Sequence, residues 1–229
     1  MRGFINKTPV WATVAVVSMT LAGCSSDDGA AQGGSPSQSE AAPPASSAPA
    51  EPVEVEPSVC GLEAGDAELP ADRPADLEVS TWRDVSLPTS KTHGPGEETA
   101  RQRSCFAHDP EGAALAAINL QAQMATVEDI NRIMSEGSVK DQIMGQWGTP
   151  MTGASVEGTP VAYRVDDFAG DRAQVTWAMR IGSEFRLAPY LMVWQGGDWL
   201  IDGETPASDR PKVESVSELD GQGLVMLDD

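Results

Sequence analysis

The clearest pattern in this chain is a ten-residue alternation, Arg172-Ala173-Gln174-Val175-Thr176-Trp177-Ala178-Met179-Arg180-Ile181. Every second side chain from Ala173 to Ile181 is apolar, and most of the side chains between them are polar or small. A period of two over ten residues predicts a β-strand with one apolar and one polar face. The strand therefore belongs to a sheet that buries one of its faces.

The neighbouring stretches continue this pattern on both sides. Residues 161–166 alternate in the same way, and residues 185–193 predict a third strand. Gly196-Gly197-Asp198 is typical of a hairpin turn and leads into a fourth strand at 199–202. Pro189 within the third strand predicts a bulge or an edge of the sheet there, because proline has no N–H to donate. Together these strands predict an antiparallel meander.

Helix signals precede the meander. Asp109-Pro110-Glu111 combines an N-cap residue, a proline at the first helical position and an acid in the first turn. A second helix is predicted from Thr126 to Gly137, and a third from Ser138 to Trp147. Helices followed by an antiparallel meander predict an α+β fold in which the helices pack on one face of the sheet.

The segments on either side of this region are less regular. Residues 61–104 hold many Gly, Pro, Asp and Glu, and predict only a short strand near Leu77 to Val85. The C-terminal residues 204–229 form an acidic tail. Its apolar residues Gly223 to Leu227 could form a last strand or a partner-binding peptide, but a frayed end is the favoured interpretation.

The N-terminus has the layout of a secretory signal. Arg2 and Lys7 precede an apolar run from Val10 to Ala22, and Leu21-Ala22-Gly23-Cys24 resembles a bacterial lipobox. The run of about 13 residues is shorter than the ~20 that a membrane-spanning helix needs. The alternatives are such a helix, or an ordinary cleaved signal beside a chance cysteine. We expect residues 1–23 to be a lipoprotein signal peptide and Cys24 to be acylated, palmitate being one expected chain, which places the protein on the extracytoplasmic face of a cell membrane.

A linker follows the lipidated cysteine. Residues 25–58 are rich in Pro, Ser and Ala and contain no aromatic residue, Lys or Arg. Such a composition cannot bury enough apolar surface to offset its ordering entropy, so a disordered tether is predicted over 24–59. The folded domain is predicted over 60–203.

Cysteine usage agrees with export. With Cys24 lipidated, Cys60 and Cys105 are an even pair in an oxidising compartment, which predicts a disulfide. A metal site is the alternative, since His108 follows Cys105 by three residues. Nothing stands near Cys60 at ligand spacing, so neither a metal nor another cofactor is expected.

Net charge excludes one class of partner. Thirty-five Asp and Glu against fifteen Lys and Arg give a formal net charge of −20. Such a surface repels nucleic acid, because phosphate binding requires clustered Lys and Arg. It also disfavours docking on anionic lipid heads, so the acylated Cys24 is expected to hold the protein on the bilayer.

The two histidines and one carboxylate cluster are candidate groups for chemistry. His93 lies in a loop and His108 stands just before the first predicted helix, and neither stands beside a nucleophile motif such as Gly-x-Ser-x-Gly. Asp166, Asp167 and Asp171 bracket a turn, but their spacing does not match a calcium loop and a solvated hairpin end is favoured. No catalytic residue is therefore assigned.

Trp194 is the strongest candidate for an interface or pocket. It falls on the opposite strand parity from Leu191 and Val193, so it is expected to face the other side. Trp199 and His108 are grouped with it as candidate interface or pocket residues.

Three stretches carry a family resemblance: Cys60-Gly61-Leu62, the segment 105–114 and the segment 193–199. They resemble an actinobacterial domain of unknown function. The order of helices and meander is similar to the nuclear-transport-factor-two-like or SnoaL-like cone fold of conjugation-associated proteins. The resemblance implies a curved, cone-like sheet, an exported or membrane-anchored protein and no known catalytic residues.

The function expected from these observations is a lipid-anchored, non-enzymatic accessory factor that binds an envelope protein. The resemblance implies conjugative or secretion machinery as its setting. The alternative is a small-ligand-binding or enzymatic cone-fold domain displayed on the cell envelope.

Overall fold

The computed structural model describes residues 56–124, 127–146 and 158–228 of the 229-residue chain. The predicted signal peptide at 1–23, Cys24 and the linker up to residue 55 lie outside the described residues, so the lipid anchor stays a prediction. In the ranges that are described, no helix has the length and apolar character needed to span a bilayer.

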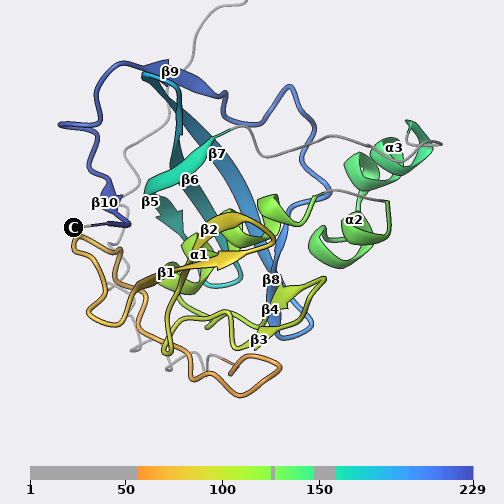
Figure 1. Cartoon of the computed structure of the whole chain (residues 1–229). Helices are drawn as coiled ribbons and strands as arrows, with labels where there is room; N and C mark the ends of the chain where they lie inside the picture. Colours follow the sequence, from red (N-terminus) through yellow and green to blue (C-terminus); the bar gives the residue numbers. More distant parts are fainter. Residues whose placement is uncertain (1–55, 125–126, 147–157, 229) are drawn as a thin grey trace, which may run out of the picture. The chain divides into compact units, whose positions relative to one another are not determined.

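The predicted meander is confirmed, and it forms most of an open antiparallel sheet (Figure 1). The strand order is β10-β5-β6-β7-β8, and a further short strand, β9, also pairs with β7. The strands are β5 (Thr159–Phe168), β6 (Arg172–Ile181), β7 (Glu184–Gln195), β8 (Asp198–Ile201), β9 (Glu214–Val216) and β10 (Val225–Met226). The fold is thus a mixture of helices and antiparallel sheet in which sheet predominates.

Pro189 lies at a local edge of this sheet, which is one of the two positions that its sequence predicted. Its register partner is Thr176 in β6, with no shift in register around it, so the bulge alternative is wrong. On the other side of β7, β9 pairs with Phe185–Leu187 and β8 pairs with Met192–Gln195. Pro189 falls in the gap between these two partners, where a missing N–H breaks no ladder bond.

The first helix, α1 (Pro110–Ala122), starts where its capping signal predicted. Asp109 caps it by accepting a hydrogen bond from the Gly112 N–H at 2.6 Å. Every residue from Pro110 to Leu120 is buried, because α1 contacts the sheet and also the hairpin of β1 (Glu78–Trp82) and β2 (Val85–Thr89). A helix that is covered all round carries apolar residues on every side, so its pattern is less one-sided than that of a surface helix.

The other two helices are short. The helix α2 (Val127–Ile133) ends before the predicted Gly137, because the chain turns out of the helix to meet β8. Met134 bridges to Ile201, and the Ser135 N–H donates to the Ile201 carbonyl at 2.9 Å. The helix α3 (Ser138–Gln146) begins at its predicted residue, and its predicted last residue, Trp147, lies outside the described residues.

The segment before α1, which we call the leader, differs from the prediction made for residues 61–104. Instead of one strand near Leu77 to Val85, the chain forms the β1–β2 hairpin, turning at Arg83 and Asp84. Both turn residues have positive φ, 48° and 66°, the geometry of the tightest hairpin turns, which Asn-Gly usually signals. No such signal is present here. A further pair, β3 (Glu97–Glu98) and β4 (Arg103–Ser104), completes the leader.

The end of the chain is part of the fold. In β10, Val225 pairs with Tyr163 of β5, and both Val225 and Leu227 are buried in the main core. The last-strand alternative is therefore confirmed, and the frayed end that the sequence favoured is wrong for these residues. The physical reason is their alternation, which turns Val225 and Leu227 inward while Met226 stays exposed.

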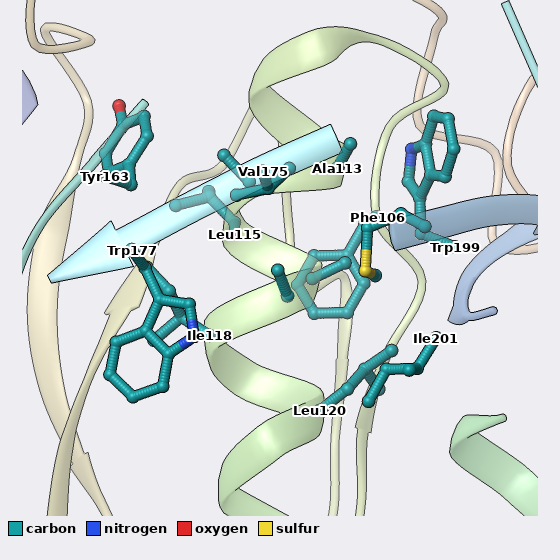
Figure 2. Close-up of a cluster of buried hydrophobic side chains, with 14 of the residues drawn as sticks. Phe106, Ala113, Leu115, Ile118, Leu120, Tyr163, Val175, Trp177, Trp199 and Ile201 are labelled. Carbon is teal, nitrogen blue, oxygen red and sulfur yellow. The ribbon is translucent and has the colours of Figure 1, made fainter. Parts of the chain in front are cut away.

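The main core fills the space between α1 and the sheet (Figure 2). Leu115 and Ile118 from the helix meet Val175 and Trp177 from β6, and Trp199 closes one end. On the other face of the sheet, Leu187 belongs to a smaller cluster that the C-terminal residues cover.

Candidate functional site

Three residues that the sequence grouped as candidates meet in one aromatic cluster. His108 stands just before the N-cap of α1, Trp194 lies near the end of β7 and Trp199 near the start of β8. The β7–β8 hairpin pairs Trp194 with Trp199, and the imidazole of His108 stacks on the Trp194 indole at 4.0 Å between ring centroids. Trp199 meets both rings edge-on, at 5.6 Å from His108 and 5.4 Å from Trp194.

The two tryptophans have different surroundings. Trp199 is fully buried, and its indole N–H donates to the Ala107 carbonyl at 2.9 Å, so it supports the cluster from the core. Trp194 is half-buried and packs against the main core. Trp194 points to the opposite side of β7 from Leu191 and Val193, as its position in the strand predicts. That side, however, faces the core. A role for either tryptophan in an interface stays a prediction.

His108 is the most unusual polar group of the cluster. Its side chain is only 5% exposed, yet neither ring nitrogen has a hydrogen-bond partner among the described residues. Nε2 lies 3.2 Å from Asp171 Oδ1, but the ring N–H is not directed at that oxygen well enough for a hydrogen bond. An unsatisfied buried polar group costs about 1–3 kcal/mol, so the contact with Asp171 matters for this ring.

A hollow of about 460 Å³ opens beside this imidazole. We call it the His108 hollow; its walls are Gly65, Asp66, Ala67, His108, Phe168, Ala169, Gly170 and Asp171. Its volume falls within the range of about 300–1,000 Å³ that is typical of ligand pockets. The leader supplies one wall and the turn between β5 and β6 supplies the other, so the hollow lies between two surface segments. Its carboxylates, Asp66 and Asp171, are both exposed.

The leader wall is fastened to the domain close to the hollow. The predicted disulfide between Cys60 and Cys105 is present, with Cα atoms 6.0 Å apart. The Val59 N–H donates to the Gly197 carbonyl at 2.7 Å in the β7–β8 turn. Asp198 accepts hydrogen bonds from the N–H groups of Cys105 and Phe106, at 2.6 and 2.9 Å. Burial raises the pKa of Asp198, although these bonds favour the charged form.

A second hollow, of about 280 Å³, adjoins the start of α1. We call it the Glu111 hollow; its walls are Gly65, Asp66, Glu68, Pro70, Asp72, Pro74, His93, Asp109, Pro110 and Glu111. His93 Nδ1 lies 2.9 Å from Asp109 Oδ2, and the Glu111 carboxylate accepts a hydrogen bond from the Tyr163 hydroxyl. Gly65 packs so closely that a Cβ there would come within 2.5 Å of Asp109 Oδ2.

The groups around the Glu111 hollow have shifted pKa values. Burial, aided by the charges of Asp109 and Asp76, raises the pKa of Glu111 to about 7, although Tyr163 and His93 oppose the shift. Burial acts to lower the pKa of His93, but the hydrogen bond and charge of Asp109 outweigh it, so this pKa is raised. A carboxyl that titrates near neutral pH can exchange protons as a general acid or base.

Sequence reasoning did not find this network. In the sequence, Glu111 indicates only the start of a helix, and His93 lies in a predicted loop. Tyr163 lies 52 positions along the chain from Glu111, and no local pattern links them. In the described ranges, no three His, Cys, Asp or Glu side chains are arranged so that they could hold a metal ion.

Comparison with known proteins assigns no activity to either hollow. A family model with the description "Domain of unknown function (DUF8175)" matches residues 38–224, which include both hollows, the aromatic cluster and most of the acidic tail. No curated protein and no solved structure matches the chain.

Proposed function

Because the chain belongs to the DUF8175 family of domains of unknown function, we propose its function from its own geometry: it is a non-enzymatic binding domain that holds another protein of the cell envelope. The proposal includes the features predicted from the sequence, namely a signal peptide, an acylated Cys24, an extracytoplasmic location and a cone-like curvature of the sheet. Conjugative or secretion machinery is the setting that the sequence resemblance implies.

One observation carries this proposal. His108 is nine-tenths buried, its ring nitrogens lack hydrogen-bond partners among the described residues, and it lines the His108 hollow. The ring forms part of the wall of the hollow, and Asp171 Oδ1 lies 3.2 Å from its Nε2, so a group bound in the hollow would change the surroundings of this imidazole.

The setting of the hollow favours a protein over a free small molecule. Ala67, Ala169 and Gly170 are all exposed, so a chain lying over the surface can reach the hollow from outside. A small ligand is usually enclosed over most of its surface, and here both walls are exposed surface segments. The tether predicted over 24–59 suits a domain that must search for a partner on the same membrane.

Site-specific photo-crosslinking in cells tests the proposal. A photoreactive amino acid is placed at Ala169 in the wall of the His108 hollow, in full-length protein on its native membrane. The matched control places it at Ser183, an exposed residue beyond the other end of β6. We expect Ala169 to crosslink one envelope protein that Ser183 does not reach, identified by mass spectrometry. Equal crosslinking from the two positions, or none from Ala169, would refute the proposal.

A second candidate function is supported by the Glu111 hollow. A buried carboxyl with a pKa of about 7, beside a His93–Asp109 pair, is suited to acid–base chemistry. This observation favours the enzymatic alternative. Its test compares wild type with Glu111→Gln on a panel of ester, glycoside and phosphate-ester substrates. If wild type turns over a substrate and a folded Glu111→Gln protein does not, the protein is an enzyme that uses Glu111.

A further inference from the structure

We infer that the His108 hollow receives an apolar side chain of the partner whose neighbours in sequence are Lys or Arg. The inference rests on the proposed function and specifies the chemistry of the segment that is bound. It follows from two properties of the hollow: apolar walls and carboxylates at its edge.

The apolar walls favour an apolar side chain of the partner, which we call the anchor side chain. Phe168, Ala67 and Ala169 offer hydrocarbon surface, and the two glycines of the wall, Gly65 and Gly170, offer no side chain that would occupy the space. Burying an apolar side chain against such surface is the main favourable term in protein association. A volume of about 460 Å³ accommodates one large side chain together with part of its backbone.

The carboxylates favour Lys or Arg on either side of the anchor side chain. Asp66 lies on the leader wall and Asp171 on the opposite wall, and both are exposed. The chain carries a formal net charge of −20, so its long-range field also attracts basic segments and repels acidic ones. Cationic side chains on both sides of the anchor would meet one carboxylate at each wall, and charge complementarity of this kind governs partner choice.

The imidazole forms a fixed part of the wall. His108 is held on one face by the Trp194 stack, and Asp171 Oδ1 lies 3.2 Å from its Nε2.

A peptide series tests this chemistry on the full-length protein in lipid nanodiscs, with empty nanodiscs as the blank. The peptide acetyl-Gly-Lys-Phe-Lys-Gly-amide is compared by calorimetry with analogues in which both Lys become Gln, both Lys become Glu, or Phe becomes Gly. We expect the Lys-Phe-Lys peptide to bind about fivefold more tightly than the Gln analogue, since two exposed ion pairs contribute about two- to threefold each. The Glu and Gly analogues should show no measurable binding.

Variants of the protein locate the binding. Asp66→Asn with Asp171→Asn should abolish the preference for Lys over Gln, whereas Glu184→Gln with Glu214→Gln, two exposed acids elsewhere, should leave it unchanged. Ala67→Trp should fill the hollow and abolish binding of every peptide. Equal affinity for the Lys and Gln peptides, or binding that survives Ala67→Trp, would overturn the inference.

The outcome separates this inference from the proposed function. If Ala169 crosslinks an envelope protein but none of the peptides binds, the proposed function stands and the basic–apolar chemistry is wrong. If Ala169 crosslinks nothing and the peptides also fail, both are wrong.

Discussion

The imidazole of His108 lies parallel to the indole of Trp194, with ring centroids 4.0 Å apart and ring planes 1° apart. The two residues are brought together by different elements, the start of α1 and the end of β7. Because Trp194 also meets Trp199 edge-on at 5.4 Å, one side chain joins the His108 hollow to the core. The geometry of the hollow thus depends on this stack.

Replacing Trp194 by Ala should destabilise the domain by about 2–4 kcal/mol, because a large half-buried aromatic and its ring contacts are removed. Trp194→Phe should cost much less. The indole N–H has no hydrogen-bond partner among the described residues, so its loss leaves nothing newly unpaired. Urea unfolding monitored by circular dichroism measures both values. Equal destabilisation by the two substitutions would show that the indole N–H does have an important partner.

The disulfide should stabilise the leader wall most of all. Cys60 and Cys105 are 45 positions apart, and closing a loop of that length contributes about 4 kcal/mol in the chain-entropy model. The variant with both cysteines changed to Ser should lose stability of this order. Limited proteolysis should then cut first in the 61–76 segment, which carries no helix or strand. A change below about 1 kcal/mol would mean that the Asp198 and Gly197 bonds hold the leader without the disulfide.

How far the sequence predicts this molecule depends on the range of the interactions involved. The strands β6 and β7 and the start of α1 were predictable, because period-two alternation and the Asp109 cap are local signals. The Arg83–Asp84 turn was not, since its positive φ values are adopted without the glycine that normally announces them. The strand β10 could be offered only as an alternative to a frayed end, because two residues are too few to show a period.

In the candidate site, too, residues marked by local signals could be predicted, and contacts between distant segments could not. His108, Trp194 and Trp199 could be singled out, since a hairpin places the two tryptophans opposite each other and His108 precedes a recognisable helix start. The Glu111–Tyr163 contact depends on the packing of α1 on β5, which no pattern in either segment encodes. The His108 hollow could not be predicted either, because one of its walls is a leader segment without periodicity.

Stability should fall with rising pH because of Glu111. Burial raises the folded-state pKa of this carboxyl to about 7, whereas an unfolded chain titrates near its ordinary value of about 4.3. Between these values the folded state holds a proton that the unfolded state has released, so stability decreases as pH increases. The full effect is roughly 3 kcal/mol between pH 4.5 and 7.5.

Glu111→Gln should remove this pH dependence, since the amide is neutral at every pH and its oxygen can still accept from the Tyr163 hydroxyl. The variant should therefore be more stable than wild type at pH 8 and similar to it at pH 5. Urea unfolding at pH 5, 6, 7 and 8 provides the comparison. Parallel pH profiles for the two proteins would show that the Glu111 pKa is not raised.

The last residues of the chain offer a matched pair for testing whether the tail belongs to the core. Leu227 is 1% exposed and lies in the main core, whereas its neighbour Met226 is 44% exposed. Leu227→Ala should cost about 2–4 kcal/mol as a core truncation, and Met226→Ala should stay within about 0.5 kcal/mol. The Arg73 side chain donates to the Leu227 carbonyl at 3.0 Å, a bond to the backbone that both substitutions preserve, so the difference reports side-chain burial alone. If neither substitution changes the urea midpoint, the tail is frayed in solution; if both destabilise equally, the alternation of buried and exposed residues in β10 is wrong.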